Sequence, residues 1–134
     1  MNLIGEHIDY LGFPVLPMAI GRRLSLECTP LSDRLIRVSS NHHGVREFEW
    51  TTDLPPWPQG DFGNYIKAAA QAVGVRWATG CGFDGVITST IPEAAGLSSS
   101  SALVTAVTLA LLRLRGIPWN FPELMDVLPE GEMY

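Results

Sequence analysis

The chain has 134 residues, of which 46% are hydrophobic and 17% charged, and its formal net charge is −5 at pH 7. A chain of this length can bury a core within one domain, and this composition excludes an intrinsically disordered protein. The acidic balance argues against a protein that binds nucleic acid or acidic membranes, because both need a basic surface.

Cysteine usage and hydropathy indicate the compartment. Cys28 and Cys81 have no CxxC partner or nearby histidine cluster, so they predict reduced thiols. The N-terminus carries Glu6 and Asp9 and lacks the basic region of a secretory signal. The longest apolar run, Ala102 to Leu112, is too short to span a bilayer. We therefore expect a cytoplasmic protein without a membrane partner.

The first part of the chain predicts turns and strands. Residues 1–10 suggest a loop that leaves a strand, and residues 11–17 hold a glycine and two prolines typical of a turn. Apolar and polar side chains alternate from Ala19 to Pro30, which predicts a half-buried strand.

Two alternating runs, Arg34–Ser40 and Val45–Thr51, predict a hairpin around the turn 41–44. We expect His42 and His43 to lie at a solvated turn tip and not to bind a metal. The apolar residues of the second strand are Val45, Phe48 and Trp50.

A proline-rich loop, Asp53 to Gly60, precedes the first predicted helix. Asp61 is a suitable N-cap and Gly74 a suitable residue to end the helix. Five residues between them share one predicted apolar face: Phe62, Tyr65, Ile66, Ala69 and Val73.

A strand from Phe83 to Ile91 is predicted to lead into a core helix from about Ser98 to Arg115, which Gly116 ends. A short helix, Phe121 to Leu128, is expected to begin at Asn120 as N-cap. Strands followed by helices predict an α+β fold, in which helices pack against one face of a mixed sheet.

A glycine and four serines stand at the start of the predicted core helix. Serine hydroxyls cap first-turn amides, and four serines are more than one helix start requires. Together with the positive end of the helix dipole, they indicate an anion site that suits phosphate. The alternative is a structural helix with surplus caps. The residues of this loop are Gly96, Leu97, Ser98, Ser99, Ser100 and Ser101.

Two carboxylates and an imidazole lie together on the N-terminal loop, at Glu6, His7 and Asp9. Carboxylates accept strong hydrogen bonds from hydroxyl groups, so this set suits a sugar. Either carboxylate alone could simply cap the turn.

Three ordered blocks resemble the galactokinase branch of the GHMP small-molecule kinases. Asn2–Tyr10, followed by Val15–Ile20, resembles the galactokinase signature, and Pro92–Ala102 resembles the phosphate loop of the superfamily. Phe62–Lys67 is similar to the family's Trp-Ala-Asn-Tyr-Val-Lys helix start. The resemblance implies the two-layer α+β fold of the GHMP kinase N-terminal domain and ATP-dependent phosphorylation of the anomeric hydroxyl of a galactose-like sugar.

The resemblance also implies residue roles. Glu6, His7 and Asp9 would hold the sugar, and Gly96 to Ser101 would surround the ATP phosphates. Ser100 and Glu132 would serve Mg²⁺. Phe62, in place of the usual Trp, and Tyr65 would flank the base, although core packing is an equally good interpretation of Phe62.

Two groups that the family uses for phosphoryl transfer have no counterpart in the sequence. The Arg that precedes the first block and the Asp of a downstream Met-Asp loop are both missing, as is the C-terminal domain. We therefore expect residues 1–134 to be an N-terminal domain truncated at both ends, with no catalytic residue present and at most weak binding. An apolar face that the second domain would cover is expected to cause self-association.

The substrate is open between galactose, our first choice, and N-acetylgalactosamine, which Ile8 and the run Val15–Ala19 favour. A second enzymatic alternative is another GHMP kinase that acts on mevalonate, homoserine or a heptose phosphate, although Asp9 and Tyr10 disfavour the mevalonate branch. Two non-enzymatic alternatives are a sugar- and ATP-binding regulator and a purely structural α+β domain.

Overall fold

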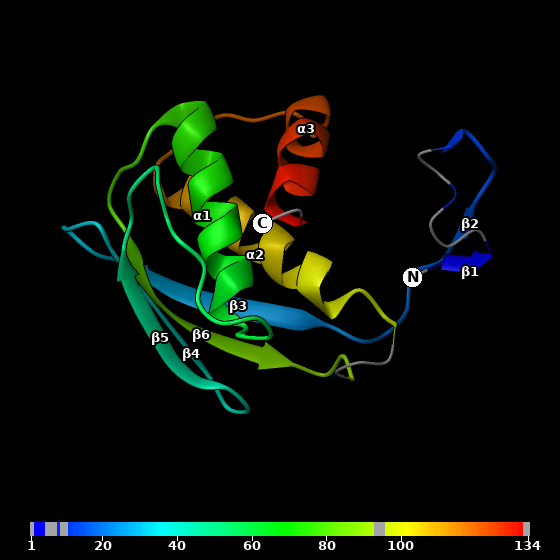
Figure 1. Cartoon of the computed structure of the whole chain (residues 1–134), viewed down its shortest axis with the longest axis horizontal. Coiled ribbons are helices and arrows are strands. Elements are labelled where there is room, and N and C mark those ends of the chain that lie inside the picture. Colours follow the sequence, from blue (N-terminus) through cyan, green and yellow to red (C-terminus); the bar gives the residue numbers. More distant parts are fainter. Residues whose placement is uncertain (1, 5–7, 9–10, 93–95, 133–134) are drawn as a thin grey trace.

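The computed structural model describes residues 2–4, 8, 11–92 and 96–132. Within these residues, a four-stranded sheet carries helices α1 (Gly63–Trp77), α2 (Ser99–Leu114) and α3 (Phe121–Glu132) on one face (Figure 1). The sheet consists of β3 (Leu24–Pro30), β4 (Leu35–Ser40), β5 (Gly44–Glu49) and β6 (Phe83–Ser89). The predicted two-layer α+β architecture is confirmed.

The sheet is mixed, with the strand order β3-β6-β4-β5. β3 pairs antiparallel with β6, β4 pairs antiparallel with β5, and β4 lies parallel to β6. The parallel pair requires the chain to cross from β5 to β6, and α1 lies on this connection. The core faces the helices, with Ile36, Val38 and Phe83 fully buried.

The hairpin of β4 and β5 forms as predicted, but Val45 does not belong to its apolar face. Val45 is 54% exposed, whereas Trp50, just beyond the end of β5, is fully buried. Successive side chains of a strand point to opposite faces, so Phe48 and Trp50 share a side that Val45 cannot reach. The strand prediction was right, and the inclusion of Val45 in its apolar set was wrong.

α1 begins at Gly63 with Phe62 as its N-cap residue, one position after the predicted N-cap Asp61, and it ends later than predicted. Asp61 Oδ1 accepts a hydrogen bond from the Gly63 amide at 2.9 Å, which caps the first turn. The helix continues through Gly74 to Trp77, so the prediction that Gly74 ends it was wrong. Gly74 is buried, and a Cβ there would lie 3.1 Å from Trp50 Nε1. This glycine therefore provides space for the indole.

Tyr65 was also misplaced on the buried face of α1, because its side chain is 39% exposed. The buried face of α1 includes Ile66, Ala69, Ala70 and Val73.

The end of α2 and the start of α3 follow the sequence closely. Gly116, with φ of +62°, donates to the Arg113 carbonyl at 3.1 Å, and Ile117 N–H reaches the Leu112 carbonyl at 2.9 Å. These two bonds form a Schellman motif. At the start of α3, the Glu123 amide donates to Asn120 Oδ1 and the Asn120 amide to Glu123 Oε2, which is a capping box. α3 runs to Glu132, beyond the predicted end at Leu128.

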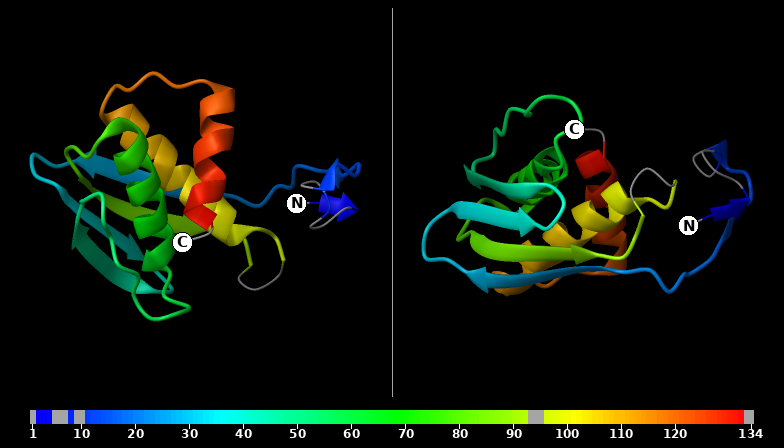
Figure 2. Two further views of the ribbon diagram at one scale, coloured as in Figure 1. Left: turned by 45° about the horizontal axis from the view of Figure 1, so that its top comes forward. Right: turned by 90° about the horizontal axis from the view of Figure 1, so that it is seen from below.

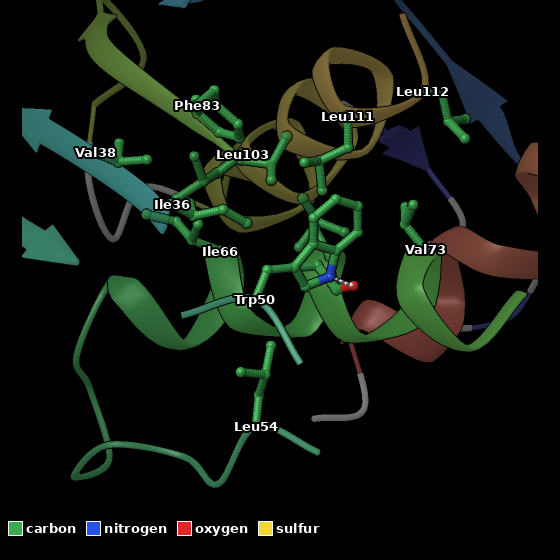
Figure 3. Close-up of a cluster of buried hydrophobic side chains, with 14 of the residues drawn as sticks. Ile36, Val38, Trp50, Leu54, Ile66, Val73, Phe83, Leu103, Leu111 and Leu112 are labelled. Atoms are coloured by element: carbon green, nitrogen blue, oxygen red, sulfur yellow. Dashed lines mark hydrogen bonds between the residues drawn. The ribbon is translucent and has the colours of Figure 1, made fainter. Parts of the chain in front are cut away.

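Trp50 occupies the centre of the core, between the sheet and α1 (Figure 3). Its indole Nε1 donates to the Ala70 carbonyl at 2.7 Å, so the polar atom of this fully buried ring is satisfied. The Arg115 guanidinium lies 5.4 Å from the centre of the Trp50 ring and donates to the carbonyls of Trp77 and Ala78. Arg115 thereby caps the C-terminal end of α1.

The N-terminal segment stands apart from the two layers. β1 (Asn2–Ile4) and β2 (Leu16–Pro17) pair antiparallel as a small separate sheet, and Figures 1 and 2 show it beside the main body. Six of its apolar side chains are exposed, namely Leu3, Ile4, Leu11, Phe13, Leu16 and Met18.

Two remaining predictions concern the cysteines and the membrane. Cys28 and Cys81 are both free thiols, and burial raises the pKa of Cys28. Across residues 2–4, 8, 11–92 and 96–132, no helix has the length and apolar character needed to cross a bilayer.

Candidate phosphate and nucleotide site

The serine loop lies at the N-terminal end of α2, and residues 90–95 connect it to β6. Its entrance is fixed to the start of β3, because Thr90 N–H donates to the Arg23 carbonyl at 2.8 Å and Arg23 N–H donates to Thr90 Oγ1 at 2.9 Å. Gly96 has φ of +65°, and Ser98, the N-cap residue, is left-handed with φ of 54° and ψ of 43°. A non-glycine residue pays for this conformation in strain, and such strain gathers at ligand sites.

Ser98 does not act as the side-chain cap that its residue type suggests. Ser98 makes no side-chain capping bond, although its carbonyl accepts the first helical bond from Ala102 at 3.0 Å. An N-cap side chain reaches the first-turn amides from an extended backbone, and Ser98 is not extended. The amides of Ser99, Ser100 and Ser101 therefore lie at a positive helix end that Ser98 leaves uncapped.

The residues of the phosphate loop differ in exposure. Gly96 and Ser98 are exposed, whereas Leu97, Ser99, Ser100 and Ser101 are half-buried. Residues 93–95, which precede the loop, lie outside the described residues. The predicted loop thus lies at the N-terminal end of α2, and two of its residues, Gly96 and Ser98, have a left-handed backbone.

The two proposed magnesium ligands are Ser100 and Glu132. Ser100 lies in the first turn of α2, and α3 ends at Glu132, whose side chain is outside the described part. Figures 1 and 2 both show the C-terminal end of α3 directed toward the N-terminal half of α2. Among the side chains that the structure describes, no group of three His, Cys, Asp or Glu residues forms a metal site.

Phe62 and Tyr65, the two aromatic residues predicted to flank a base, differ in their surroundings. Phe62 is 8% exposed, and the His43 ring stacks on it with centroids 5.0 Å apart. The Arg46 guanidinium lies 5.6 Å from the centre of the Phe62 ring. The turn that carries His43 is exposed as expected, yet His43 packs on Phe62. Tyr65 offers the more accessible ring.

An ion pair fixes the entry into α1. Arg46 Nε and Nη2 each lie 2.9 Å from Asp61 Oδ2, and the Asp61 carboxylate also caps Gly63. Partial desolvation of Asp61 opposes its ionisation, but the Gly63 amide and the Arg46 guanidinium outweigh this and lower the pKa of the carboxyl.

Glu6, His7 and Asp9 lie outside the described residues. Ile8, between them, is described, and its carbonyl accepts hydrogen bonds from Leu11 N–H at 3.1 Å and Phe13 N–H at 3.3 Å. The chain therefore turns at Ile8, between β1 and β2, as expected for a loop that leaves a strand.

Sequence reasoning gave no role to Asn64 and Lys67. Both side chains reach the proline-rich segment before α1, and Lys67 is 6% exposed. The available signal was a polar stripe at i, i+3 and i+7 on an otherwise apolar helix, formed by Asn64, Lys67 and Gln71.

Comparison with known families identifies this arrangement. Residues 64–134 match the GHMP kinases N-terminal domain, and residues 1–30 match the galactokinase galactose-binding signature. The first match covers more than half of the chain, so the chain belongs to the GHMP kinases.

The solved structures agree. Lactococcus lactis galactokinase, determined in complex with galactose, is similar with a TM-score of 0.86 and 29% sequence identity, over 98% of this chain and 34% of that one. A mevalonate kinase is similar in fold, with a TM-score of 0.80 and 22% identity over 98% of this chain and 43% of that one. The mevalonate kinase of Methanococcus jannaschii follows with a TM-score of 0.73 and 20% identity, over 98% of this chain and 43% of that one. The chain thus spans about a third of the length of the galactokinase, and its predicted family and fold are confirmed.

Proposed function

We propose that this chain is the N-terminal, sugar- and ATP-binding domain of a galactokinase-like enzyme, which transfers the γ-phosphoryl group of ATP to the anomeric hydroxyl of galactose. The match of residues 1–30 to the galactose-binding signature carries the proposal. It separates a sugar kinase from the mevalonate kinases, which share the fold at lower identity.

The phosphate groups of ATP are proposed to bind between Gly96 and Ser101. Backbone N–H groups at a helix N-terminus bind anions because they point at the ligand and the dipole favours negative charge. The left-handed residues Gly96 and Ser98 support this role, since such turns direct successive amides into one concavity. Ser98 also leaves the first turn of α2 without a side-chain cap.

Mg²⁺ is proposed to bind beside the phosphates. It prefers oxygen ligands and retains several waters, so one serine hydroxyl, one carboxylate and phosphate oxygens suffice. Ser100, in the first turn of α2, fits this donor set, and Glu132 is the proposed carboxylate. The ion would neutralise charge on the phosphates during transfer.

The sugar and the base of ATP are proposed to bind on either side of the ATP phosphates. Glu6, His7 and Asp9 would bind sugar hydroxyls through charge-assisted hydrogen bonds. Tyr65 would contact the base directly, supported by its exposure. Phe62 packs in the core and is 8% exposed, so its proposed contact with the base is limited to this small exposed part.

The test is an assay of the full-length protein that carries this chain. We expect ATP-dependent phosphorylation of galactose that exceeds phosphorylation of N-acetylgalactosamine, measured by coupled ADP release. A reversed preference would assign the N-acetylated sugar instead. Release of no ADP with either sugar would refute a sugar kinase. The 134 residues alone are expected to be inactive, since they span 34% of the galactokinase chain that they match.

A substitution at Gly96 links activity to the loop. Gly96 has φ of +65°, and a β-branched residue there is strained. Gly96→Val is expected to abolish ATP binding, whereas Gly116→Val, at a similar φ of +62° beyond the opposite end of α2, would lower stability alone. Equal nucleotide affinity of the wild-type and Gly96→Val proteins would refute the phosphate site.

A further inference from the structure

Two polar side chains of the block 62–67, those of Asn64 and Lys67, bind a segment that has no role in the proposed function. This segment, residues 53–60, is called the strap, and it runs beside α1 between β5 and the start of the helix (Figure 1). The Asn64 side chain accepts a hydrogen bond from Trp57 N–H at 2.8 Å and donates to the carbonyls of Trp57 and Pro58 at 3.1 and 3.2 Å. One amide therefore satisfies three backbone groups of the strap.

Lys67 binds the strap one helical turn further on. Its Nζ donates to the Pro55 carbonyl at 2.7 Å and lies 3.8 Å from the centre of the Trp57 ring and 5.9 Å from that of Phe48. Desolvation lowers the pKa of this ammonium, and the Asp61 carboxylate opposes that shift. A buried cation is stable only when it is paired or bonded, and two aromatic faces with one carbonyl supply this.

The strap also lies directly on the backbone of α1. A Cβ at Gly63 would lie 2.2 Å from Trp57 Cζ3, so only glycine permits the Trp57 ring to rest there. Trp57 in turn packs edge-to-face on Phe48 at 5.9 Å between centroids. Gly63, Asn64 and Lys67 thus together determine the position of the strap.

Phe62 follows the strap and Asp61 in the chain, and its ring lies 5.6 Å from the Arg46 guanidinium of the Arg46–Asp61 ion pair. The strap leads into Asp61 and fixes the residues before Phe62, while the ion pair and the Gly63 cap fix the first turn after it. Tyr65 lies one turn further along the chain, and its amide donates to the Phe62 carbonyl at 3.2 Å. A shift of the strap would therefore move the start of α1 together with both aromatic rings.

We propose that Lys67 and Asn64 are positioning residues, which set the affinity for the nucleotide base by clamping the strap and so fixing Phe62 and Tyr65. This inference rests on the proposed function, because it assigns residues that support the base site. Neither residue touches the nucleotide in this proposal, and the sugar site is independent of both.

The test replaces Lys67 with Met in the full-length protein. Met keeps an apolar stem for Trp57 but removes the ammonium and its bond to Pro55. We expect the Kd for the non-hydrolysable analogue AMP-PNP to rise about tenfold, since small displacements of a binding group cost that much. The Kd for galactose should remain within about twofold of the wild-type value. Both are measured by titration calorimetry.

Arg115→Met provides the matched control. Arg115 is a second cation that donates to backbone carbonyls beside a tryptophan, but it clamps the opposite end of α1, at Trp77 and Ala78. Its loss should lower the melting temperature and leave the Kd for AMP-PNP unchanged. Equal weakening of nucleotide binding by Arg115→Met and Lys67→Met would show a general loss of stability and overturn the inference.

Further outcomes are equally decisive. Wild-type affinity for AMP-PNP in Lys67→Met refutes the positioning role. If Lys67→Met does not fold, Asn64→Ser is compared with Arg115→Met by the same criterion, because it removes the other half of the clamp. A wild-type protein that binds AMP-PNP without phosphorylating galactose refutes the proposed function and leaves the Kd comparison valid. A wild-type protein that binds no nucleotide refutes both.

Discussion

The contact between Gly74 and Trp50 makes a prediction that opposes helix propensity. Gly74 lies inside α1, where replacement of glycine by alanine normally stabilises a protein by about 1 kcal/mol. In this helix the new Cβ would lie 3.1 Å from Trp50 Nε1 and 3.2 Å from Thr79 Cγ2. The indole cannot move aside freely, because Nε1 donates to the Ala70 carbonyl at 2.7 Å.

The expected magnitude follows from these two opposing terms. Overpacking a tight core contact costs about 2 kcal/mol, which exceeds the gain in propensity, so Gly74→Ala should destabilise the protein by about 1 kcal/mol. Trp50→Phe removes Nε1, so in that background the propensity gain should prevail and Gly74→Ala should stabilise by about 1 kcal/mol. The coupling energy of the pair is then about 2 kcal/mol. Trp50→Phe alone should cost about 3 kcal/mol, through its lost hydrogen bond and the space that it leaves.

The assay is urea denaturation of the wild type, both single variants and the double variant, followed by circular dichroism. The four free energies of unfolding form a double-mutant cycle, in which the effect of Gly74→Ala is read with and without the indole. The same stabilisation by Gly74→Ala in both backgrounds would refute the reasoning, because it would show that Trp50 does not limit the space at Gly74.

Three further predictions concern a buried hydroxyl, an acidic cap and the exposed N-terminal segment. Thr108 Oγ1 is fully buried and has no hydrogen-bond partner among the described residues, so Thr108→Val should raise the free energy of unfolding by about 1 kcal/mol, as measured by urea denaturation. Asp61 has a lowered pKa in the folded protein, so it stabilises the fold fully above about pH 5 and loses this effect as the pH falls below about 4. Asp61→Asn should flatten that acid limb of the melting temperature against pH, and an unchanged limb would contradict the prediction. The 134-residue chain should self-associate through apolar side chains such as Leu11 and Phe13, which are 63% and 61% exposed. Sedimentation velocity should show smaller species when both are replaced by Ser, and an unchanged distribution would exclude this surface.

Features whose cause is local could be predicted from the sequence. The Asn120 cap, the Gly116 helix end and the hairpin of β4 and β5 each depend on residues within a few positions of one another. Capping and turn chemistry act over this range, so the residue types suffice to indicate the structure. The phosphate loop belongs to this group, since a glycine, serines and an apolar helix stand next to each other in the chain.

Features that depend on distant contacts could not be predicted. The sequence offers Gly74 as a helix end, and only the packing of Trp50, twenty-four positions earlier, shows that it provides space for an indole. Ser98 is a good capping residue by type, yet its left-handed backbone prevents capping.

The sequence by itself therefore determined the class of the protein, its strands and helices, and the loop proposed to hold phosphate, because each is written in neighbouring residues. Only the tertiary structure decided what the block 62–67 does. Asn64 and Lys67 resemble part of a nucleotide motif, but their hydrogen bonds go to the strap, and Phe62 packs beneath His43. The physical reason is burial, because an ammonium within aromatic rings is stable only where distant segments fold around it.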